Sequence, residues 1–321
     1  MRRRVAIATV VVSVAVLVAC QPSRPTSGPG SAAADIPTSV TTTDVGSGTD
    51  GTRVYTFVPN VLKGGTSAPV VVVLHGFQLL APDIYGGLID HLNRQGYIVV
   101  FPAYSKGGFS ILNDTDQNAM QARAIASTTQ AIDALGAKAD RSQVFLFGHS
   151  LGGLVAATWA ARGGIAPAGI LLANPSTSSG AGIPDFVPVT VTPIPWASLA
   201  GATTAPTVIL TGDQDTIAAP AESLALYDAL TGVTTKGVYE LRGDATQSPA
   251  IQADHMAAIQ SQGIVPDWMM NALGGDAEED TADWRYYWAA LDQLLAGDAT
   301  PTFDMGRWSN GTPVKPILQL R

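Results

Sequence analysis

Short apolar runs and longer amphipathic stretches alternate along the middle of the chain. Continuous apolar runs are typical of parallel strands buried on both faces, and the stretches between them have helical length. The predicted strands are 54–58, 69–74, 97–102, the run ending at Phe147, 169–173, 207–210 and 236–241. The predicted helices are 83–95, 114–135, 151–162, 220–230 and 281–295. This alternation predicts an α/β fold: a mostly parallel central sheet with helices on both faces and no large cap domain.

The first twenty residues have the pattern of an export signal. Three arginines, Arg2 to Arg4, precede an apolar run from Val5 to Val18 that is short for a bilayer span. The ending Leu17-Val18-Ala19-Cys20 resembles the bacterial lipobox, whose cysteine becomes the lipidated first residue, and Cys20 is the only cysteine of the chain. We therefore expect residues 1–20 to be a lipoprotein signal, Cys20 to be lipidated and the protein to be anchored in the cell membrane on its extracytoplasmic side. A plain signal peptide that leaves the protein secreted, or an N-terminal membrane anchor with an incidental Cys20, remains open.

The segment 21–51 differs in composition from the rest of the chain. It is rich in Pro, Ser, Thr and Gly and has almost no large apolar residue, so it is predicted to be a flexible linker. Residues 52–321 are then one catalytic domain.

Composition and charge limit which binding partners and cofactors the sequence favours. The 321 residues carry a formal net charge of −8, which disfavours nucleic acid as a partner. The sequence has no phosphate-binding loop, no dinucleotide glycine pattern and no cluster with metal-ligand spacing, so we expect neither a cofactor nor a metal. We expect a monomer.

One pentapeptide carries the main chemical signal. Gly148-His149-Ser150-Leu151-Gly152 lies between the apolar run ending at Phe147 and a helical stretch of small residues. In this pattern a serine occupies a tight strand-to-helix turn, and flanking glycines leave room for the neighbouring strand and helix. Because the context agrees with the pattern, Ser150 is the predicted nucleophile rather than a structural turn serine.

A serine hydroxyl needs a base and an acid. Of the four histidines only His255 follows both the serine and an acid at a strand end, so the chain order Ser, Asp, His selects it over a purely structural role. Two acids, Asp213 and Asp215, follow the same predicted strand, and spacing alone does not choose between them.

The chain resembles a serine hydrolase of the α/β-hydrolase superfamily. The segments 74–77, 96–100, 148–152, 212–218 and 253–256 resemble the branch of chlorophyllases, platelet-activating-factor-acetylhydrolase-like esterases and bacterial cutinase-like polyester hydrolases. The resemblance spans roughly residues 54–295. It implies that Asp215, the aspartate of Asp-Thr-Ile, is the triad acid.

The same resemblance implies the rest of the site. The backbone N–H groups of Phe77 and Leu151 would form the oxyanion hole. Phe77, Trp196, Ile217 and Met256 would contact the substrate. The segment between Ala173 and Trp196 departs from the compact pattern of the polyester hydrolases, and residues 174–206 either form a lid or pack on the core.

These expectations favour one activity. The predicted protein is a serine carboxylester hydrolase that acts on short to medium acyl or aryl esters, small or polymeric, through an acyl-enzyme. An envelope acyltransferase would use the same triad, and a non-catalytic binding protein on this fold is the remaining alternative.

Overall fold

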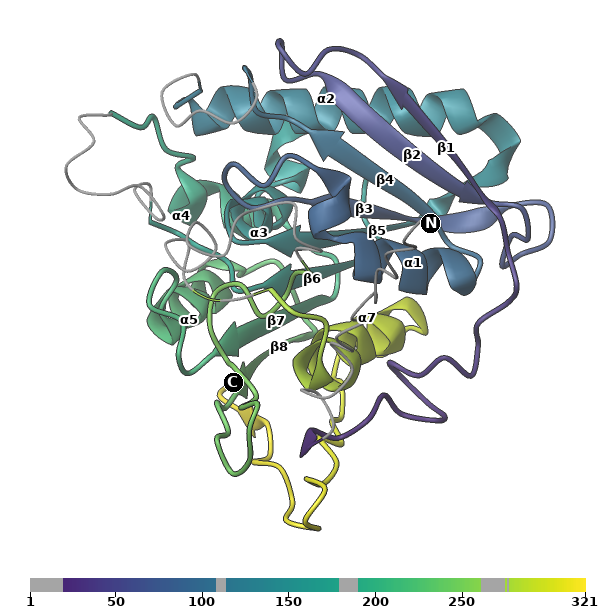
Figure 1. The fold of residues 1–321 in the computed structure, drawn as a ribbon. Helices are drawn as coiled ribbons and strands as arrows, with labels where there is room; N and C mark the ends of the chain where they lie inside the picture. Colours follow the sequence, from purple (N-terminus) through teal and green to yellow (C-terminus); the bar gives the residue numbers. More distant parts are fainter. Residues whose placement is uncertain (1–19, 108–113, 179–189, 261–274, 276) are drawn as a thin grey trace, which may run out of the picture.

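A computed structural model describes residues 20–107, 114–178, 190–260, 275 and 277–321 (Figure 1). In this part of the chain one sheet has the strand order β1-β2-β4-β3-β5-β6-β7-β8-β9. Its strands are β1 (Val40–Val45), β2 (Arg53–Pro59), β3 (Ala68–Leu74), β4 (Ile98–Ala103), β5 (Ala139–His149), β6 (Gly169–Ala173), β7 (Thr207–Gly212), β8 (Lys236–Leu241) and β9 (Leu318–Gln319). Strands β3 to β8 run parallel, whereas the pairs β1/β2, β2/β4 and β8/β9 are antiparallel.

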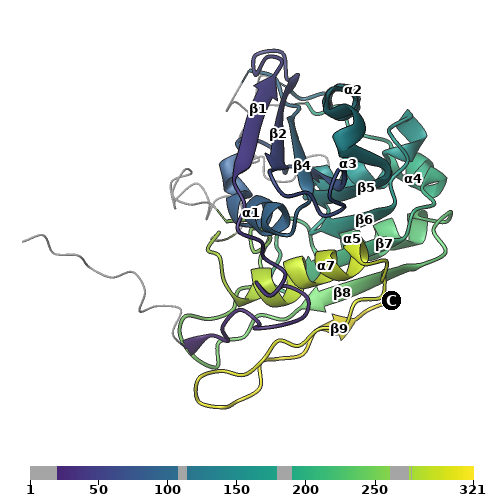
Figure 2. The ribbon, with the colours of Figure 1, turned by 90° about the vertical axis from the view of Figure 1, so that its right-hand side faces the viewer.

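Helices cover both faces of the sheet (Figures 1 and 2). They are α1 (Gly86–Arg94), α2 (Gln117–Leu135), α3 (Leu151–Ala157), α4 (Trp196–Leu199), α5 (Pro220–Ala229) and α7 (Trp288–Leu295). Short η helices are η2 (Pro82–Ile84), η3 (Gly136–Lys138), η4 (Ala160–Arg162), η5 (Ala200–Ala202) and the π-helical η6 (Asp283–Tyr287).

The central strand β3 shows why its sequence is continuously apolar. Val71 and Val73 pack in the core layer that contains α1 and α7. Val70 and Val72 pack in the layer that contains α2, α3 and α5. Side chains alternate between the faces of a strand, so a strand covered on both sides needs apolar residues at every position.

The architecture confirms the predicted class: it is an α/β-hydrolase fold with a mostly parallel sheet and flanking helices. Differences from the prediction concern element ends. The last helix is divided into η6 and α7, and the helix after the nucleophile ends as α3 and η4. In the connection 174–206, the candidate lid, the described residues form only α4 and η5, and residues 179–189 lie outside the described residues.

Part of the segment 21–51, which the sequence predicts to be a flexible linker, is a strand of the sheet. Residues Val40–Val45 form β1, which pairs with β2 from Val40 opposite Pro59 to Val45 opposite Val54. All six β1 residues are solvent-exposed. A strand at a sheet edge is held by backbone hydrogen bonds and by β-branched residues such as the threonines here, so the lack of large apolar side chains did not exclude it.

The residues after Cys20 are also bound to the domain. Gln21 donates to the carbonyl of Ala250 (3.1 Å), and Arg285 donates through Nη2 to the carbonyl of Ser23 (2.8 Å). Arg24 donates to Nδ1 of His91 on α1 (2.7 Å). The chain therefore follows the domain surface from its first described residues. The rest of the predicted signal, 1–19, lies outside the described residues, and among the described helices none is long and apolar enough to cross a bilayer.

Candidate active site

Ser150 lies on the sharp turn between β5 and α3. Its backbone has φ 55° and ψ −120°, a conformation that is strained for any residue with a Cβ. The neighbouring glycines are required by space, because a Cβ on Gly152 would come 2.0 Å from the carbonyl oxygen of Leu74 and one on Gly148 would come 2.4 Å from that of Gly152. The turn therefore lifts the serine above the carboxyl end of the sheet, as the pentapeptide predicts.

Three predicted side chains meet at this turn. Ser150 Oγ lies 2.9 Å from Nε2 of His255, and Nδ1 of His255 lies 2.8 Å from Oδ2 of Asp215. An ionised carboxylate only accepts hydrogen bonds, so Nδ1 carries the proton and Nε2 is left to accept from the serine hydroxyl. This is the arrangement in which the imidazole can take the serine proton.

The two candidate acids occupy different places. Oδ1 of Asp215 accepts from the backbone N–H groups of Ile217 (2.9 Å) and Ala218 (2.7 Å), and Oδ2 faces His255. Asp213 is exposed and its Oδ1 accepts from the N–H of Gly243 (2.8 Å). The structure thus brings Asp215, and not Asp213, to the imidazole.

Two backbone N–H groups flank the serine. Leu151 is the first residue of α3, where N–H groups have no partner within the helix. Phe77 follows Gly76, whose added Cβ would come 3.3 Å from the Cβ of Ser150, so this loop runs beside the nucleophile. Among the described residues neither N–H has a hydrogen-bond acceptor. Both are available to a substrate oxygen, as an oxyanion hole requires.

Two further histidines lie beneath the site and are buried. Burial lowers the pKa of His75 to about 4 and that of His149 to about 3, the latter also through the nearby His255. Both are therefore neutral at pH 7 and serve as hydrogen-bonding groups. Nε2 of His149 lies 2.9 Å from the carbonyl oxygen of His255, and its Nδ1 lies 3.1 Å from the Tyr85 hydroxyl.

The predicted substrate residues are spread more widely. Phe77 and Ile217, which follow β3 and β7, are partly buried, and Trp196 begins α4 and packs against the α2/α3 core layer. Met256 is only 1% exposed and packs in the opposite core layer. Its side chain is taken up by the core, so its burial does not support the predicted role as a cleft wall. The substrate roles of the other three remain predictions.

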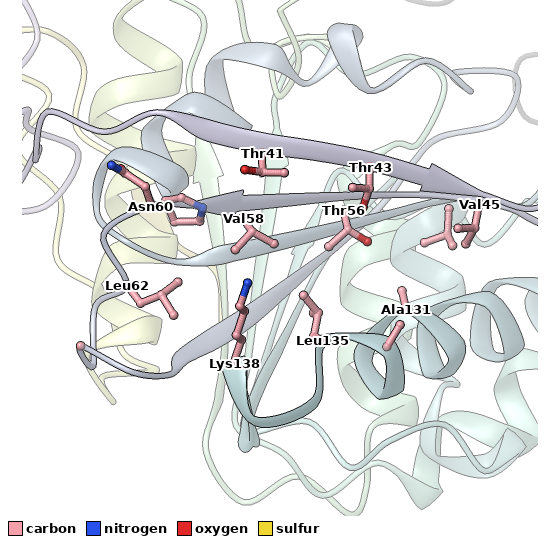
Figure 3. Close-up of a pocket in the computed structure, with 14 residues that line it drawn as sticks. Thr41, Thr43, Val45, Thr56, Val58, Asn60, Leu62, Ala131, Leu135 and Lys138 are labelled. Atoms are coloured by element: carbon pink, nitrogen blue, oxygen red, sulfur yellow. The ribbon is translucent and has the colours of Figure 1, made fainter.

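A groove of about 430 Å³ lies elsewhere, between β1, β2 and the end of α2 (Figure 3). Thr41, Val58, Leu135 and Lys138 are among its lining residues. Lys138 directly precedes β5, whereas Ser150 directly follows it, so the two residues lie at opposite ends of this strand. This groove is not part of the serine site.

Sequence reasoning missed the groups that hold the triad. Asn174, which follows β6, donates through Nδ2 to Oδ2 of Asp215 (3.0 Å), and its Oδ1 accepts from the hydroxyl of Tyr287 (2.8 Å). The available signal was a polar residue directly after a parallel strand, at the sheet edge where ligands bind in open α/β folds. In the described part of the chain no group of three or more His, Cys, Asp or Glu could hold a metal ion.

Comparisons with known proteins agree with this class of site. The family model described as Hydrolase_4, serine aminopeptidase, S33, matches residues 65–198, which include the nucleophile turn. No curated protein sequence matches the chain. The matched range carries the turn at Ser150, so this part of the chain is similar to serine hydrolases of the α/β-hydrolase fold.

Two solved structures are similar at low identity. A proposed dienelactone hydrolase from Klebsiella pneumoniae is 16% identical, with a TM-score of 0.49 over 68% of this chain and 88% of that one. A proposed dipeptidyl aminopeptidase IV from Bacteroides ovatus is 16% identical, with a TM-score of 0.47 over 64% of this chain and 33% of that one. The fold assignment rests on the sheet order and the turn at Ser150.

Proposed function

We propose that this protein is a carboxylester hydrolase in which Ser150, His255 and Asp215 act as the catalytic triad. The observation that supports this most strongly is the continuous hydrogen-bonded chain from Ser150 Oγ through the imidazole to Asp215, with distances of 2.9 and 2.8 Å. These three residues are 4–6% exposed, so water screens the charges of the site little.

The geometry supports a two-step acyl transfer. Ser150 Oγ attacks the ester carbonyl while Nε2 of His255 takes its proton, and the carbonyl oxygen becomes an oxyanion facing the N–H groups of Phe77 and Leu151. The tetrahedral intermediate collapses, the alcohol leaves with the proton from Nε2, and an acyl-serine remains. Water, deprotonated by His255, then attacks the acyl-serine and releases the acid.

We propose esters rather than peptides as substrates. An aminopeptidase binds the free amino group of its substrate, which requires a carboxylate with free lone pairs near the nucleophile. The nearby carboxylate of Glu222 already accepts through Oε2 from the Thr177 N–H and hydroxyl and from the Ser178 N–H. Oε2 thereby holds this loop, and the esterase-like segments 148–152 and 212–218 support an ester as the substrate.

The test compares Ser150→Ala with a control at another buried serine, Ser223→Ala on α5. Ser150→Ala should abolish both turnover of p-nitrophenyl butyrate and labelling by a fluorophosphonate, while Ser223→Ala should retain both. Labelling of the Ser150→Ala protein would exclude Ser150 as the nucleophile. Faster cleavage of aminoacyl-nitroanilides than of esters by the wild type would replace the esterase assignment by an aminopeptidase.

The acyl-chain preference is part of the proposal. Short and medium acyl chains are expected to be preferred, because each added methylene contributes roughly 1 kcal/mol only while there is apolar wall to contact. Turnover of p-nitrophenyl esters of graded length should therefore plateau at modest length. A steady rise to long chains with activation at a lipid interface would contradict it.

We also propose that the protein is anchored outside the cytoplasm by lipid on Cys20. The proposal is supported by the lipobox-like sequence before Cys20. Since Gln21, Ser23 and Arg24 are hydrogen-bonded to the domain, such an anchor would hold the domain close to the bilayer rather than on a long tether.

A further inference from the structure

Asn174 occupies a special position directly after β6. Its backbone is in the left-handed region, with φ 47°, which asparagine tolerates better than most residues. Its N–H donates to the carbonyl of Leu210 on β7 (2.8 Å), and its side chain is completely buried. This backbone directs the amide toward the loops that follow β7 and β8.

The amide of Asn174 bonds to three separate parts of the fold. Nδ2 donates to Oδ2 of Asp215 (3.0 Å) and to the carbonyl oxygen of Asp254 (2.9 Å). Oδ1 accepts from the hydroxyl of Tyr287 in η6 (2.8 Å). A carboxylate and a carbonyl both only accept, so only the NH₂ end of the amide can face them, and its orientation is fixed.

These bonds act on the acid and on the base at once. Oδ2 of Asp215 is the same oxygen that accepts from Nδ1 of His255, and Oδ1 is held by the N–H groups of Ile217 and Ala218. With donors on both oxygens the carboxylate cannot rotate away from the imidazole. Asp254 directly precedes His255, so the second bond from Nδ2 fixes the loop that carries the base.

Tyr287 completes the arrangement from the other side. It is completely buried, and burial raises the pKa of its hydroxyl well above the usual value, so the group remains a donor. Its donation to Oδ1 leaves Nδ2 of Asn174 free for Asp215 and Asp254. Tyr287, in the C-terminal part of the chain, is thereby linked to Asp215 by hydrogen bonds through the side-chain amide of Asn174.

We propose that Asn174, oriented by Tyr287, is a positioning residue that holds Asp215 and His255 in register for the proposed ester hydrolysis. This inference rests on the proposed function, since it assigns a role within that triad. Displacing catalytic groups by about 1 Å costs on the order of 10²-fold in rate, which sets the size of the expected effect.

The first test uses two adjacent tyrosines as a matched pair. Tyr286 and Tyr287 are both fully buried, but the Tyr286 hydroxyl bonds to the backbone of Thr211 and Tyr239 and not to Asn174. Tyr287→Phe should slow fluorophosphonate labelling of Ser150 and lower kcat about tenfold with KM unchanged. Tyr286→Phe should lower the melting temperature at least as much, yet leave the labelling rate within about twofold.

The second test changes Asn174 itself. Asn174→Ala should lower kcat about 10²-fold with little change in KM. Asn174→Asp, which has the same shape, places a second carboxylate against Asp215 and favours the protonated imidazole, so the acidic limb of the pH–kcat/KM profile should move to higher pH. Should Asn174→Ala fail to fold, Asn174→Asp and Tyr287→Phe carry the test.

The outcomes separate the two proposals. Absence of fluorophosphonate labelling in the wild type would overturn the proposed function. A second outcome would overturn the positioning role alone. In it the wild type is labelled normally, and the Asn174→Asp and Tyr287→Phe proteins fold and keep the wild-type kcat and pH profile.

Discussion

Nε2 of His149 lies 2.9 Å from the backbone carbonyl oxygen of His255, so the residue before the proposed nucleophile binds the backbone of the proposed base. A carbonyl only accepts, so Nε2 carries the proton and Nδ1 of His149 accepts from the Tyr85 hydroxyl (3.1 Å). That hydroxyl in turn accepts from the N–H of Gly76 (2.8 Å), beside Phe77. One buried chain of hydrogen bonds thus joins the predicted oxyanion loop to the loop of the base.

Removing the hydroxyl of Tyr85 should therefore lower activity as well as stability. In Tyr85→Phe the N–H of Gly76 loses its acceptor and Nδ1 of His149 its donor, and leaving such buried groups unpaired costs about 1–3 kcal/mol. We expect kcat for p-nitrophenyl butyrate to fall and KM to change little. Tyr104→Phe is the control, because that buried hydroxyl donates to the carbonyl of His75 instead. Equal losses of kcat in the two variants would assign Tyr85 to general packing.

The two aspartates after β7 should differ sharply in their effect on catalysis. Asp215→Asn removes the charge that faces Nδ1 of His255 and permits the wrong tautomer, for which the expected loss in kcat approaches about 10⁴-fold. Asp213→Asn alters only an exposed contact with Gly243 and should change kcat less than about threefold. Steady-state kinetics of both variants measure these two losses in kcat. A larger loss in Asp213→Asn than in Asp215→Asn would identify Asp213 as the triad acid.

The buried histidines should make stability depend on pH. His75 has a pKa of about 4 in the folded protein and about 6.5 when unfolded, so below pH 6.5 only the unfolded chain takes up the proton. Its contribution to stability is full above pH 6.5 and is lost as the pH falls toward 4. His149, whose pKa is also lowered, likewise makes the protein less stable as the pH falls. Burial raises the pKa of Asp283, so this residue makes the protein less stable as the pH rises.

A comparison of variants isolates this effect. The free energy of unfolding of His75→Gln should lie below that of the wild type at pH 7, and the difference should shrink by about 2 kcal/mol at pH 5, because the variant has lost this proton uptake. Urea denaturation at both pH values measures it. For Tyr104→Phe, which alters the ring stacked on His75 at 4.0 Å, the difference from wild type should stay constant. A constant difference for His75→Gln would mean that the pKa of His75 is the same in the folded and the unfolded protein.

Local signals predicted the sheet and the nucleophile turn well. The continuous apolar run Val70 to Leu74 indicates a strand that is buried on both faces, as the structure has it. The glycines at 148 and 152 occupy positions where a Cβ would collide with backbone atoms. The strand β1 was missed because an edge strand is stabilised by pairing with β2, which no local pattern of β1 records.

Contacts between distant parts of the chain explain the other misses. Asn174 and Tyr287 are 113 residues apart, and their hydrogen bond exists only once η6 packs beneath the sheet. The choice of Asp215 over Asp213 likewise depends on where the loop after β8 places His255. A sequence pattern indicates which residue types are present at strand ends, whereas the fold determines which of them meet.

Cys20 gives a prediction that is independent of catalysis. If Cys20 is diacylated, two chains are buried in the bilayer at about 0.8 kcal/mol for each methylene, which makes anchoring stable rather than transient. Cys20→Ala should then move the protein from the membrane fraction to the soluble fraction. Its kcat should not change, because Cys20 contacts the domain at Ser309 and not at the triad. Mass spectrometry of the N-terminal peptide measures the lipid directly. Wild-type protein found only in the culture fluid, with an unmodified N-terminal peptide, would exclude the anchor.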